Sequence, residues 1–580
     1  MGVFEKFSER WTRLLNRLAA RRAAIGRPAT AFVSQPEPRT IGSSARGRQL
    51  IAGNFLFAGH LLQEPQTGIW ELAVPDHGFA AALHGFGWLD DLAAVADATA
   101  RARARTWLWR WIALYGRGAG PGWTPDLAGR RLIRWISHAP FLLSGCSSDE
   151  SHAFYRALAA QTAFLARRWR AAAPGLPRFE ALTGLIYAGI SLEGMERHVK
   201  PAIAALDREC KARIDAQGGL PTRNPEELLE VLTLLTWAAV ALGETQHPIS
   251  QAHWQAIERI APTLRTLRHA DGGLARFHGG GRGLPGRLDA ALANSGVKGR
   301  ASDGLAMGFA RLGGGRTSVI IDAAPPPSGM ASTNAHASTL AFELTSGRRP
   351  LIVSCGSGAN FGQDWRRAAR ATQSHSTLVL EGRSSALIDP SRQGREYLVS
   401  APRRVPMEIS EAADGLRFEG GHDGYVRDFG LTHVRKLELG LDGRSLTGED
   451  MLMALEPADT QRFDRALDAS RLTGIPFELR FHLHPDVDVS LDMGGTAVSM
   501  ALMSGEIWVL RSDGTARMSV ESSFYLEKTR LMPRATKQIV LSARAIEYAT
   551  RVRWSLAKPH DSPVAVRDLA ELRLDPVTDC

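Results

Sequence analysis

The sequence predicts an α+β protein with more than one domain, in which a helical first half is followed by a large antiparallel β sandwich. A chain of 580 residues is too long for one ordinary domain, and 44% hydrophobic with 22% charged residues is typical of a globular protein. The apolar residues recur at helical spacing from about residue 79 to 268, and they alternate in short runs beyond residue 304. This change of period divides the chain.

Residues 1–50 form a basic segment with the pattern of an amphipathic helix. Five apolar residues fall on one helical face, and five arginines fill much of the rest: Phe7, Trp11, Leu14, Leu15 and Leu18, with Arg10, Arg13, Arg17, Arg21 and Arg22. A helix lying on an anionic membrane has this pattern, and so has a helix that docks on its own protein. No apolar run is long enough for a signal peptide or a membrane span, so we expect neither a cleavable signal nor a transmembrane helix.

Residues 51–268 are expected to form a stack of helices. The helical period is clearest in six segments, which cover 81–115, 130–143, 153–172, 179–192, 200–214 and 225–242. One helix start is explicit in the sequence, because Asn224 suits the N-cap, Pro225 suits the first helical position and Glu227 follows three residues after the cap. The stretch "AQGGLPTR" before it is therefore expected to be a turn that leads into a helix.

Residues 269–304 are rich in glycine, proline and small polar residues, which predicts a long crossing loop, and loops of this length are often functional. Residues 305–580 then contain runs with a period of two, punctuated by Gly, Asp and Ser. The clearest predicted strands cover 317–322, 338–344, 350–355, 376–382, 416–421, 434–443, 477–493 and 506–513. This part is expected to be the antiparallel sandwich.

Composition favours some partners and excludes some chemistries. The formal net charge is +10, and arginine supplies 62 of the 70 basic residues, which suits bidentate binding of carboxylate, sulfate or phosphate; an arginine-rich genome would give the same bias. No RNA-binding signature accompanies the charge, so we expect no nucleic-acid partner. The chain has no Walker loop, HExxH or GxSxG motif. Its four cysteines share no CxxC spacing, so neither a disulfide framework nor a zinc knuckle is indicated.

Several long phrases of the sequence resemble, in the same order, the heparinase II/III family of bacterial polysaccharide lyases. In the first half they are "LHGFGWLDDLAA", "RRLIRWIS" and "DAQGGLPTRNPEELLEVLTLL". In the second half they are "HASTLAFELTSGRRPLIVSCG", "RATQSHSTLVLEG" and "HDGYVRDFGLTHVRKLELGLDGRSLTGEDML". The resemblance covers most of the chain. It implies an incomplete α/α toroid joined to an antiparallel β sandwich, with an anionic polysaccharide bound in the cleft between them.

The chemistry of such a lyase sets what its site must contain. Breaking the 4-linked bond of a uronic acid by β-elimination requires removal of the proton at C5, neutralisation of the neighbouring carboxylate, and protonation of the departing oxygen. Asn, His or Arg can serve at the carboxylate, and Tyr or His as base and acid, because these groups combine hydrogen-bond donation with a tunable pKa. A basic cleft also concentrates the polyanion. The reaction needs no redox cofactor.

The resemblance implies a zinc site that this sequence keeps only in part. Members of the family usually have two histidines one residue apart, the first catalytic and the second a zinc ligand, and here the pair is Asn334 and His336. A second ligand is usually an Asp eighteen residues later, where this chain has Ser354, and the third is retained as His375. His336 and His375 are the candidate zinc ligands, although a structural zinc site normally has four. Alternatively, they hydrogen-bond across strands and order the sandwich.

The candidate catalytic residues are Asn334, His336 and Tyr425. Tyr425 stands in "GGHDGYVRDFG", next to a predicted hairpin, and could supply a phenol for proton transfer; a tyrosine packed at a turn is the alternative. Lyases of the family commonly carry an Asn-His pair in a toroid helix and a Tyr after the Gly-Gly turn, and the corresponding stretches here contain neither. Tyr187 lies between apolar residues of a predicted helix and is expected in the core. The proton chemistry is therefore either reassigned or lost.

Seven residues are candidates for binding the polysaccharide: Arg223, Asn224, Arg276, His278, Trp365, Arg367 and Arg370. Arg223 and Asn224 are nearest to the helix start where lyases of the family carry a Tyr. Arg276 and His278 lie on the glycine-rich loop. The last three stand in "DWRRAARATQSH", which combines an aromatic face for a sugar ring with forked donors for carboxylates. A plain loop or an interface between domains would use the same residues.

Three functions remain open from the sequence. The first is a lyase that cleaves a uronate-containing polysaccharide by β-elimination, and the second is an inactive relative that binds polysaccharide or a synthesis complex at the cell envelope. The third is a toroid glycosidase with a carboxylate pair at Asp90 and Asp91, although neighbouring helical residues point about 100° apart and do not face each other. The expected location is the cell envelope or periplasm, or the cytoplasm. A peripheral membrane contact would use the N-terminal helix.

Overall fold

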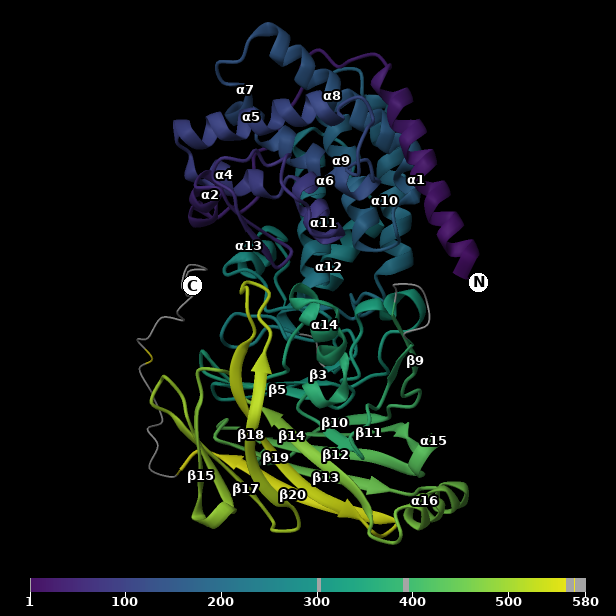
Figure 1. The fold of residues 1–580 in the computed structure, drawn as a ribbon, viewed down its shortest axis with the longest axis vertical. Helices are drawn as coiled ribbons and strands as arrows, with labels where there is room; N and C mark the ends of the chain where they lie inside the picture. Colours follow the sequence, from purple (N-terminus) through teal and green to yellow (C-terminus); the bar gives the residue numbers. More distant parts are fainter. Residues whose placement is uncertain (1, 300–303, 390–395, 560–567, 569–580) are drawn as a thin grey trace. The chain divides into compact units, whose positions relative to one another are not determined.

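The computed structural model describes residues 2–299, 304–389, 396–559 and 568 of the chain, which divides into two compact units (Figure 1). Unit 1 comprises Met1–Ala216, Leu229–Ala261 and Ala290–Val297, and unit 2 comprises Gln217–Leu228, Pro262–Asp289 and Lys298–Cys580. A helical region is followed by an antiparallel sheet domain, which confirms the fold class expected from the sequence. In the described part of the chain, no helix is both long enough and apolar enough to cross a bilayer.

The helical region contains α1 (Gly2–Ala24), α2 (Ser44–Ile51), α3 (His77–Gly85), α4 (Trp88–Val95), α5 (Ala98–Tyr115), α6 (Pro125–Ser137), α7 (Ala139–Leu143), α8 (Ser148–Arg168), α9 (Leu176–Ser191), α10 (Val199–Arg213), α11 (Pro225–Glu244), α12 (Gln251–Thr266) and α13 (Arg287–Asn294). A short hairpin joins β1 (Asn54–Phe57) to β2 (His60–Gln63). Local chemistry sets several helix starts: Asp97 caps α5, and Ser147 with Glu150 forms a capping box on α8. The segment 269–304, expected as a loop, contains α13.

Two glycines let α6 and α9 pack in direct backbone contact. A Cβ on Gly129 would lie 2.2 Å from the carbonyl oxygen of Glu180, and a Cβ on Gly184 would lie 2.4 Å from the Cα of Gly129. Arg130 and Glu180 bridge the same helices with a bond of 2.7 Å. Any side chain at either glycine would force the helices apart.

Unit 2 contains three main antiparallel sheets. The first has the order β10-β11-β12-β13-β20-β17-β16-β15, the second β18-β19-β14-β7 and the third β3-β4-β5-β6. Their bounds are β3 (Phe309–Gly314), β4 (Thr317–Asp322), β5 (Phe342–Ser346), β6 (Arg349–Ile352), β7 (Leu378–Leu380), β10 (Met407–Glu411), β11 (Gly415–Tyr425), β12 (Leu431–Gly440), β13 (Ser445–Met453), β14 (Ile475–His482), β15 (Asp488–Asp492), β16 (Ala497–Ala501), β17 (Ile507–Ser512), β18 (Arg517–Tyr525), β19 (Arg534–Ala545) and β20 (Ala549–Ala557). A small pair, β8 (Leu387–Asp389) and β9 (Tyr397–Ser400), lies apart from them in the hydrogen-bonding order. Short helices complete the unit: α14 (Gln363–Arg370), α15 (Val426–Phe429) and α16 (Pro457–Ala469).

The sheets enclose one apolar core to which each contributes. Along β12 every second residue is buried, as expected for a strand with one face on a core. Phe342 of β5 stacks on Trp554 of β20 at a centroid distance of 5.9 Å, and Phe481 of β14 meets the same indole edge-on at 4.9 Å. Trp554 therefore joins all three sheets, and Gly448 of the neighbouring strand β13 leaves room for its ring, because a Cβ there would lie 2.1 Å from the indole.

The last strand of the described residues, β20, occupies a central place in the largest sheet. Strand β20 pairs with β13 from Ser445↔Ala557 to Met453↔Ala549, and on its other side with β17. Figure 1 shows β20, in yellow, beside the green strand β13, with which it pairs. The sheet thus combines strands that are about a hundred residues apart in the sequence.

Candidate functional site

A row of three buried histidines lies in unit 2 where the resemblance places the zinc and catalytic residues. His278 follows α12 on the glycine-rich loop, His336 follows the 3-10 helix Gly329–Asn334, and His375 follows the 3-10 helix Thr372–Ser374. The ring centroids of His278 and His336 are 6.3 Å apart, and those of His336 and His375 are 5.1 Å apart. We call these three residues the histidine row. Their side chains are buried, so a solvated ligand does not reach them.

Burial keeps the imidazoles of this row neutral. It lowers the pKa of His375 to about 3, and it holds the pKa of His336 well below its usual value, because protonated His336 would also be repelled by a proton on the nearby His375. The backbone N–H of His336 donates to Nδ1 of His278 at 3.2 Å, and Nδ1 of His375 lies 3.1 Å from the hydroxyl of Ser354. Nδ1 of His336 and Nε2 of His375 have no hydrogen-bond partner among the described residues.

The donor set does not fit a zinc ion. Two imidazole nitrogens are available, but the family's carboxylate is replaced by Ser354, whose hydroxyl already bonds His375. Strand β6 ends at Ile352, before Cys355, and the Cys355 thiol lies 3.4 Å from Nδ1 of His482. The described residues contain no group of three His, Cys, Asp or Glu side chains arranged to hold a metal. A structural zinc site uses four ligands, so we derive no chemistry through zinc here.

Arg223 anchors the segment before α11 to the sheet domain. Its guanidinium binds Asp322 at 2.6 Å, and it donates to four backbone carbonyls, those of Met307, Gly308, Ala324 and Pro325. The backbone of Arg223 has a φ of 49°, in the left-handed region that few side chains adopt, and these bonds offset the strain. Arg223 therefore has every donor nitrogen engaged inside the protein.

Asp322 and Glu343 are buried carboxylates, and their charges are compensated by Arg223 and Arg276, respectively. Burial alone would raise the pKa of Asp322, but Arg223 and then His278, whose Nε2 lies 3.4 Å from the carboxylate, bring it well below its usual value. Arg276 acts in the same way on Glu343, at 3.2 Å, and lowers its pKa to about 2 against the effect of burial. Arg276 and His278 are thus internal partners of carboxylates.

The remaining candidate residues, Arg370, Arg367, Asn224 and Asn334, differ in exposure. Arg370 is buried and donates to the carbonyls of Ala335, Ser332 and Glu396, and Arg367 pairs with the Glu396 carboxylate. Asn224 caps α11: its Oδ1 accepts from the backbone N–H of residue 226 at 3.0 Å and of residue 227 at 3.1 Å. Asn334 is exposed.

Asn334 contacts Arg366 of α14, whose neighbour in the chain, Trp365, belongs to an aromatic pair. Arg366 of α14 donates to Oδ1 of Asn334 at 3.1 Å and to the carbonyl of Thr333 at 2.8 Å. Trp365 of the same helix meets Phe524 of β18 edge-on at a centroid distance of 5.0 Å, and Phe524 is 48% exposed. We call the surface formed by Asn334, Trp365, Arg366 and Phe524 the Trp365 platform. The described hydrogen-bond partners of Arg366 are neutral. Its charge acts on the Glu396 carboxylate without a direct ion pair among the described residues, and Glu396 pairs directly with Arg367.

Tyr425 lies in a different, fully buried network. Its hydroxyl donates to the carbonyl of Leu378 at 2.9 Å, and burial raises its pKa above the ordinary value of a phenol. Nearby, His433 lies 3.3 Å from His422 and 2.7 Å from Asp450, which also accepts from Arg435 at 2.8 Å. No described contact joins Tyr425 to Asn334 or to the histidine row. Tyr187 of α9 is buried in unit 1.

In unit 1, Asp90 and Asp91 have separate partners. Asp90 is buried and binds Arg134 at 3.0 Å and His138 at 2.9 Å, and Asp91 accepts from the backbone N–H of Ser43 at 2.8 Å. Burial raises the pKa of Asp91 to about 6, against the effect of that bond. The two carboxyl groups hold different segments and do not face a common space, so they do not form an acid and base pair.

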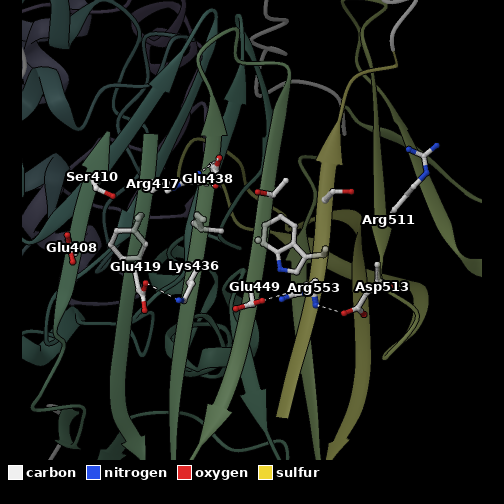
Figure 2. A pocket seen from close by; sticks show the side chains of 17 residues that line it. Glu408, Ser410, Arg417, Glu419, Lys436, Glu438, Glu449, Arg511, Asp513 and Arg553 are labelled. Atoms are coloured by element: carbon white, nitrogen blue, oxygen red, sulfur yellow. Dashed lines mark hydrogen bonds and ion pairs between the residues drawn. The ribbon is translucent and has the colours of Figure 1, made fainter. Parts of the chain in front are cut away.

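A groove of about 810 Å³ crosses the solvent face of the eight-stranded sheet (Figure 2). Side chains from successive strands line it and pair across it: Arg417 with Glu438 at 2.9 Å, Lys436 with Glu419 at 3.1 Å and Arg553 with Glu449 at 2.6 Å. Because these acids and bases neutralise one another at short range, the groove offers no net attraction to a polyanion. It is best explained as the solvated face of a twisted sheet.

Sequence reasoning missed the carboxylates and part of the platform. Asp322 ends the strand "TSVIID" and Glu343 stands inside "LAFEL", and a charged residue within an otherwise buried strand is a signal that it has a partner. Their arginines are 99 and 67 residues away in the chain, so the pairing itself has no local pattern. Phe524 lies beyond the phrases that carry the resemblance.

Solved structures with the same architecture identify the class of fold. A crystal structure of heparinase III superposes with a TM-score of 0.69 at 13% identity, over 97% of this chain and 92% of that one. Heparan sulfate lyase HepC from Pedobacter heparinus, in a mutant form, gives 0.58 at 16% identity, over 94% and 88%. A helical toroid followed by an antiparallel sandwich, with these neighbours, defines a polysaccharide lyase-like fold.

Sequence comparisons give the family. The model of the heparinase II/III-like C-terminal domain matches residues 297–555. FtsZ-localized protein C from Caulobacter vibrioides is 31% identical over 554 residues, which are 92% of this chain and 91% of that protein. The chain belongs to the heparinase II/III-like family.

Proposed function

We propose that this protein binds an anionic, uronate-containing polysaccharide at the Trp365 platform and does not cleave it by β-elimination. The observation that carries the proposal is the platform itself, where an aromatic pair lies beside an arginine whose charge has no direct ion pair among the described residues. Aromatic faces stack on the apolar faces of sugar rings, and a guanidinium binds carboxylate or sulfate with two parallel donors. The arginine excess and the net charge of +10 favour the same class of ligand.

The proton chemistry supports binding over cleavage. A base for C5 must be within hydrogen-bond reach of the sugar. His336 and Tyr425 are buried and held by internal contacts, and the exposed Asn334 is an amide that does not titrate near neutral pH. These placements leave the three candidate catalytic residues without a solvent-facing base.

Cleavage by β-elimination is the second candidate. It is favoured by membership of the family and by the exposed amide of Asn334, which could bind the uronate carboxylate as the reaction requires.

The name of the Caulobacter relative places that protein with FtsZ, and it supports a role for the present chain in cell-envelope assembly, with the polysaccharide as its ligand.

The test measures binding and cleavage on one panel of alginate, glycosaminoglycans and bacterial exopolysaccharides. Affinity electrophoresis reports binding, and ultraviolet absorbance of the unsaturated uronate reports elimination. We expect retardation by at least one polymer with no growth of absorbance. Trp365→Ala and Arg366→Gln should each weaken binding about tenfold, because each removes one principal contact to the ligand.

Matched controls separate the platform from general effects. Trp254→Ala removes an exposed tryptophan of unit 1, and Arg511→Gln removes an exposed arginine of β17, and both should bind as the unchanged protein does. Growth of absorbance that Asn334→Ala abolishes would replace the proposal with the lyase. Failure to bind any polymer, or equal loss in the controls, would contradict it.

A further inference from the structure

Helix α1 is held to unit 1 by one face only. It packs on α8, where Asn16 accepts a bond of 2.8 Å from Nε of Arg168, and the small residues Ala20 and Ala23 are buried. These docked residues lie close to one line along the helix, at spacings of four and three. The helix therefore has a clear inner face. Packing of α1 on the rest of unit 1 explains why this face is buried, but it does not explain the composition of the opposite face.

The opposite face carries a line of exposed apolar side chains. Trp11, Leu14 and Leu18 are 53%, 45% and 49% exposed, and their spacings of three and four place them on one stripe. Ile25, just beyond the helix, continues the line and is 87% exposed. From residue 11 to residue 25 the stripe would run about 21 Å at helical rise. Single exposed apolar residues are ordinary, but several of them on one helix face mark a surface that a membrane or another molecule covers. The side chain of Phe7 lies outside the described part.

Exposed arginines flank this stripe, four of them on one side and Arg22 on the other. Arg10, Arg13, Arg17 and Arg21 are exposed, and at 100° per residue they fall between the inner face and the apolar stripe. One acidic residue, Glu9, lies near them and pairs with Arg13 at 3.6 Å. The flank is thus strongly basic along the whole length of the exposed stripe.

We infer that the outer face of α1 docks in the plane of a membrane surface that contains anionic phospholipid. An apolar stripe with tryptophan and leucine enters the boundary between headgroups and acyl chains, and the neighbouring arginines bind lipid phosphates while their stems remain in the apolar layer. A second copy of the chain would bring two basic flanks together, and a polysaccharide would not bury leucine side chains. Charge and apolar exposure together therefore favour lipid.

Flotation of the full-length protein with vesicles tests this inference. Vesicles of phosphatidylcholine with phosphatidylglycerol should carry the protein, and vesicles of phosphatidylcholine alone should carry much less. The combined change Arg13→Gln, Arg17→Gln and Arg21→Gln should weaken binding about 100-fold, since each basic residue near an anionic surface contributes about a fivefold effect. Leu14→Gln with Leu18→Gln should abolish flotation while leaving the circular dichroism spectrum and the binding of polysaccharide unchanged.

The matched control changes exposed leucines elsewhere, Leu441→Gln with Leu472→Gln, and it should float as the unchanged protein does. Equal binding to both kinds of vesicle, or equal binding by the α1 variants, would overturn the inference. So would loss of a dimer on Leu14→Gln with Leu18→Gln in sedimentation without any flotation by the unchanged protein, because the occupant would then be a second copy. The result does not depend on the Trp365 platform, whose variants should float normally.

Discussion

At the residue scale, the histidine row shows how burial prevents histidines at the family's zinc positions from taking part in proton transfer with a ligand. His336 and His375 keep the residue types of a zinc site, but Ser354 supplies a hydroxyl where the family's pattern has a carboxylate, and the imidazoles remain neutral. A neutral imidazole shielded from solvent can accept or donate a hydrogen bond inside the sandwich. It cannot take a proton from a polymer that does not reach it.

Acid should destabilise the protein through these imidazoles. The folded pKa of His375 is lowered to about 3, whereas an unfolded histidine titrates near 6.5, so between these values the unfolded chain binds the extra proton. Stability is therefore complete above pH 6.5 and is lost as the pH falls toward 3, by up to about 1.4 kcal/mol per pH unit for one histidine. His482, lowered to about 4 chiefly by burial, acts in the same direction.

The variant His375→Asn removes one of these groups, and urea unfolding at pH 4.5, 5.5 and 6.5 measures the result. The slope of the unfolding free energy against pH should become shallower by up to about 1.4 kcal/mol per unit. His152→Asn, which changes an exposed histidine, serves as the control. An unchanged slope in His375→Asn would show that this imidazole is protonated in the folded protein.

At the element scale, α11 begins at a cap that the sequence predicts and the structure confirms. Asn224 accepts two backbone bonds, and Pro225 occupies the first position, where the missing N–H costs nothing. This cap also fixes a segment of unit 2, because Arg223 stands directly before it. The start of α11 and the anchoring of the sheet domain are therefore set by two adjacent residues.

Replacing Asn224 with alanine should cost about 1 kcal/mol of unfolding free energy, because two N–H groups of the first turn lose their acceptor. Asn224→Asp keeps an oxygen in place and adds a charge that suits a helix N-terminus, so it should recover most of the loss. Denaturant unfolding gives the free energies, and hydrogen exchange at residues 226 and 227 reports the cap directly. Equal destabilisation by both variants would mean that the amide acts through another contact.

Local patterns predicted the elements well and the site poorly, for physical reasons. Alternation gave strands such as β4, β12 and β17, and helical spacing gave α5, α8, α9 and α11, because each pattern reflects one buried face. The surface near Asn334 depends instead on Phe524, which approaches Trp365 from 159 residues further along the chain. Burial of His278 depends on Asp322 in the same way. Such pairings are set by tertiary packing and leave no signal in a short window.

At the scale of the whole molecule, the sheet domain depends on residues that precede it. The composition changes near residue 300, yet Arg223 and Arg276, which neutralise Asp322 and Glu343, come from segments 217–228 and 262–289 of the same compact unit. Removing one partner from a buried ion pair costs about 3–5 kcal/mol, because the other charge is left without compensation. Two such losses are comparable with the whole stability of a typical domain.

A fragment that starts at residue 305 should therefore fail to fold. Its soluble yield and its far-ultraviolet circular dichroism should be those of an unfolded chain, whereas the full chain is folded. Adding Asp322→Asn and Glu343→Gln to the fragment removes the uncompensated charges and should recover part of the folded signal. A fragment that folds fully without these changes would show that the two arginines are dispensable for the sheet domain.

The central place of β20 determines when the sandwich can be completed during synthesis. Strands β10 to β13 leave the ribosome first, followed by β14 to β19, and the eight-stranded sheet has a gap between β13 and β17 until Ala549–Ala557 emerges. A nascent chain up to about that point has two open strand edges, which are the usual starting points of aggregation. Closure of the sheet therefore waits for β20, and it is slow because its partners are far apart in sequence, so the open edges are exposed in the meantime.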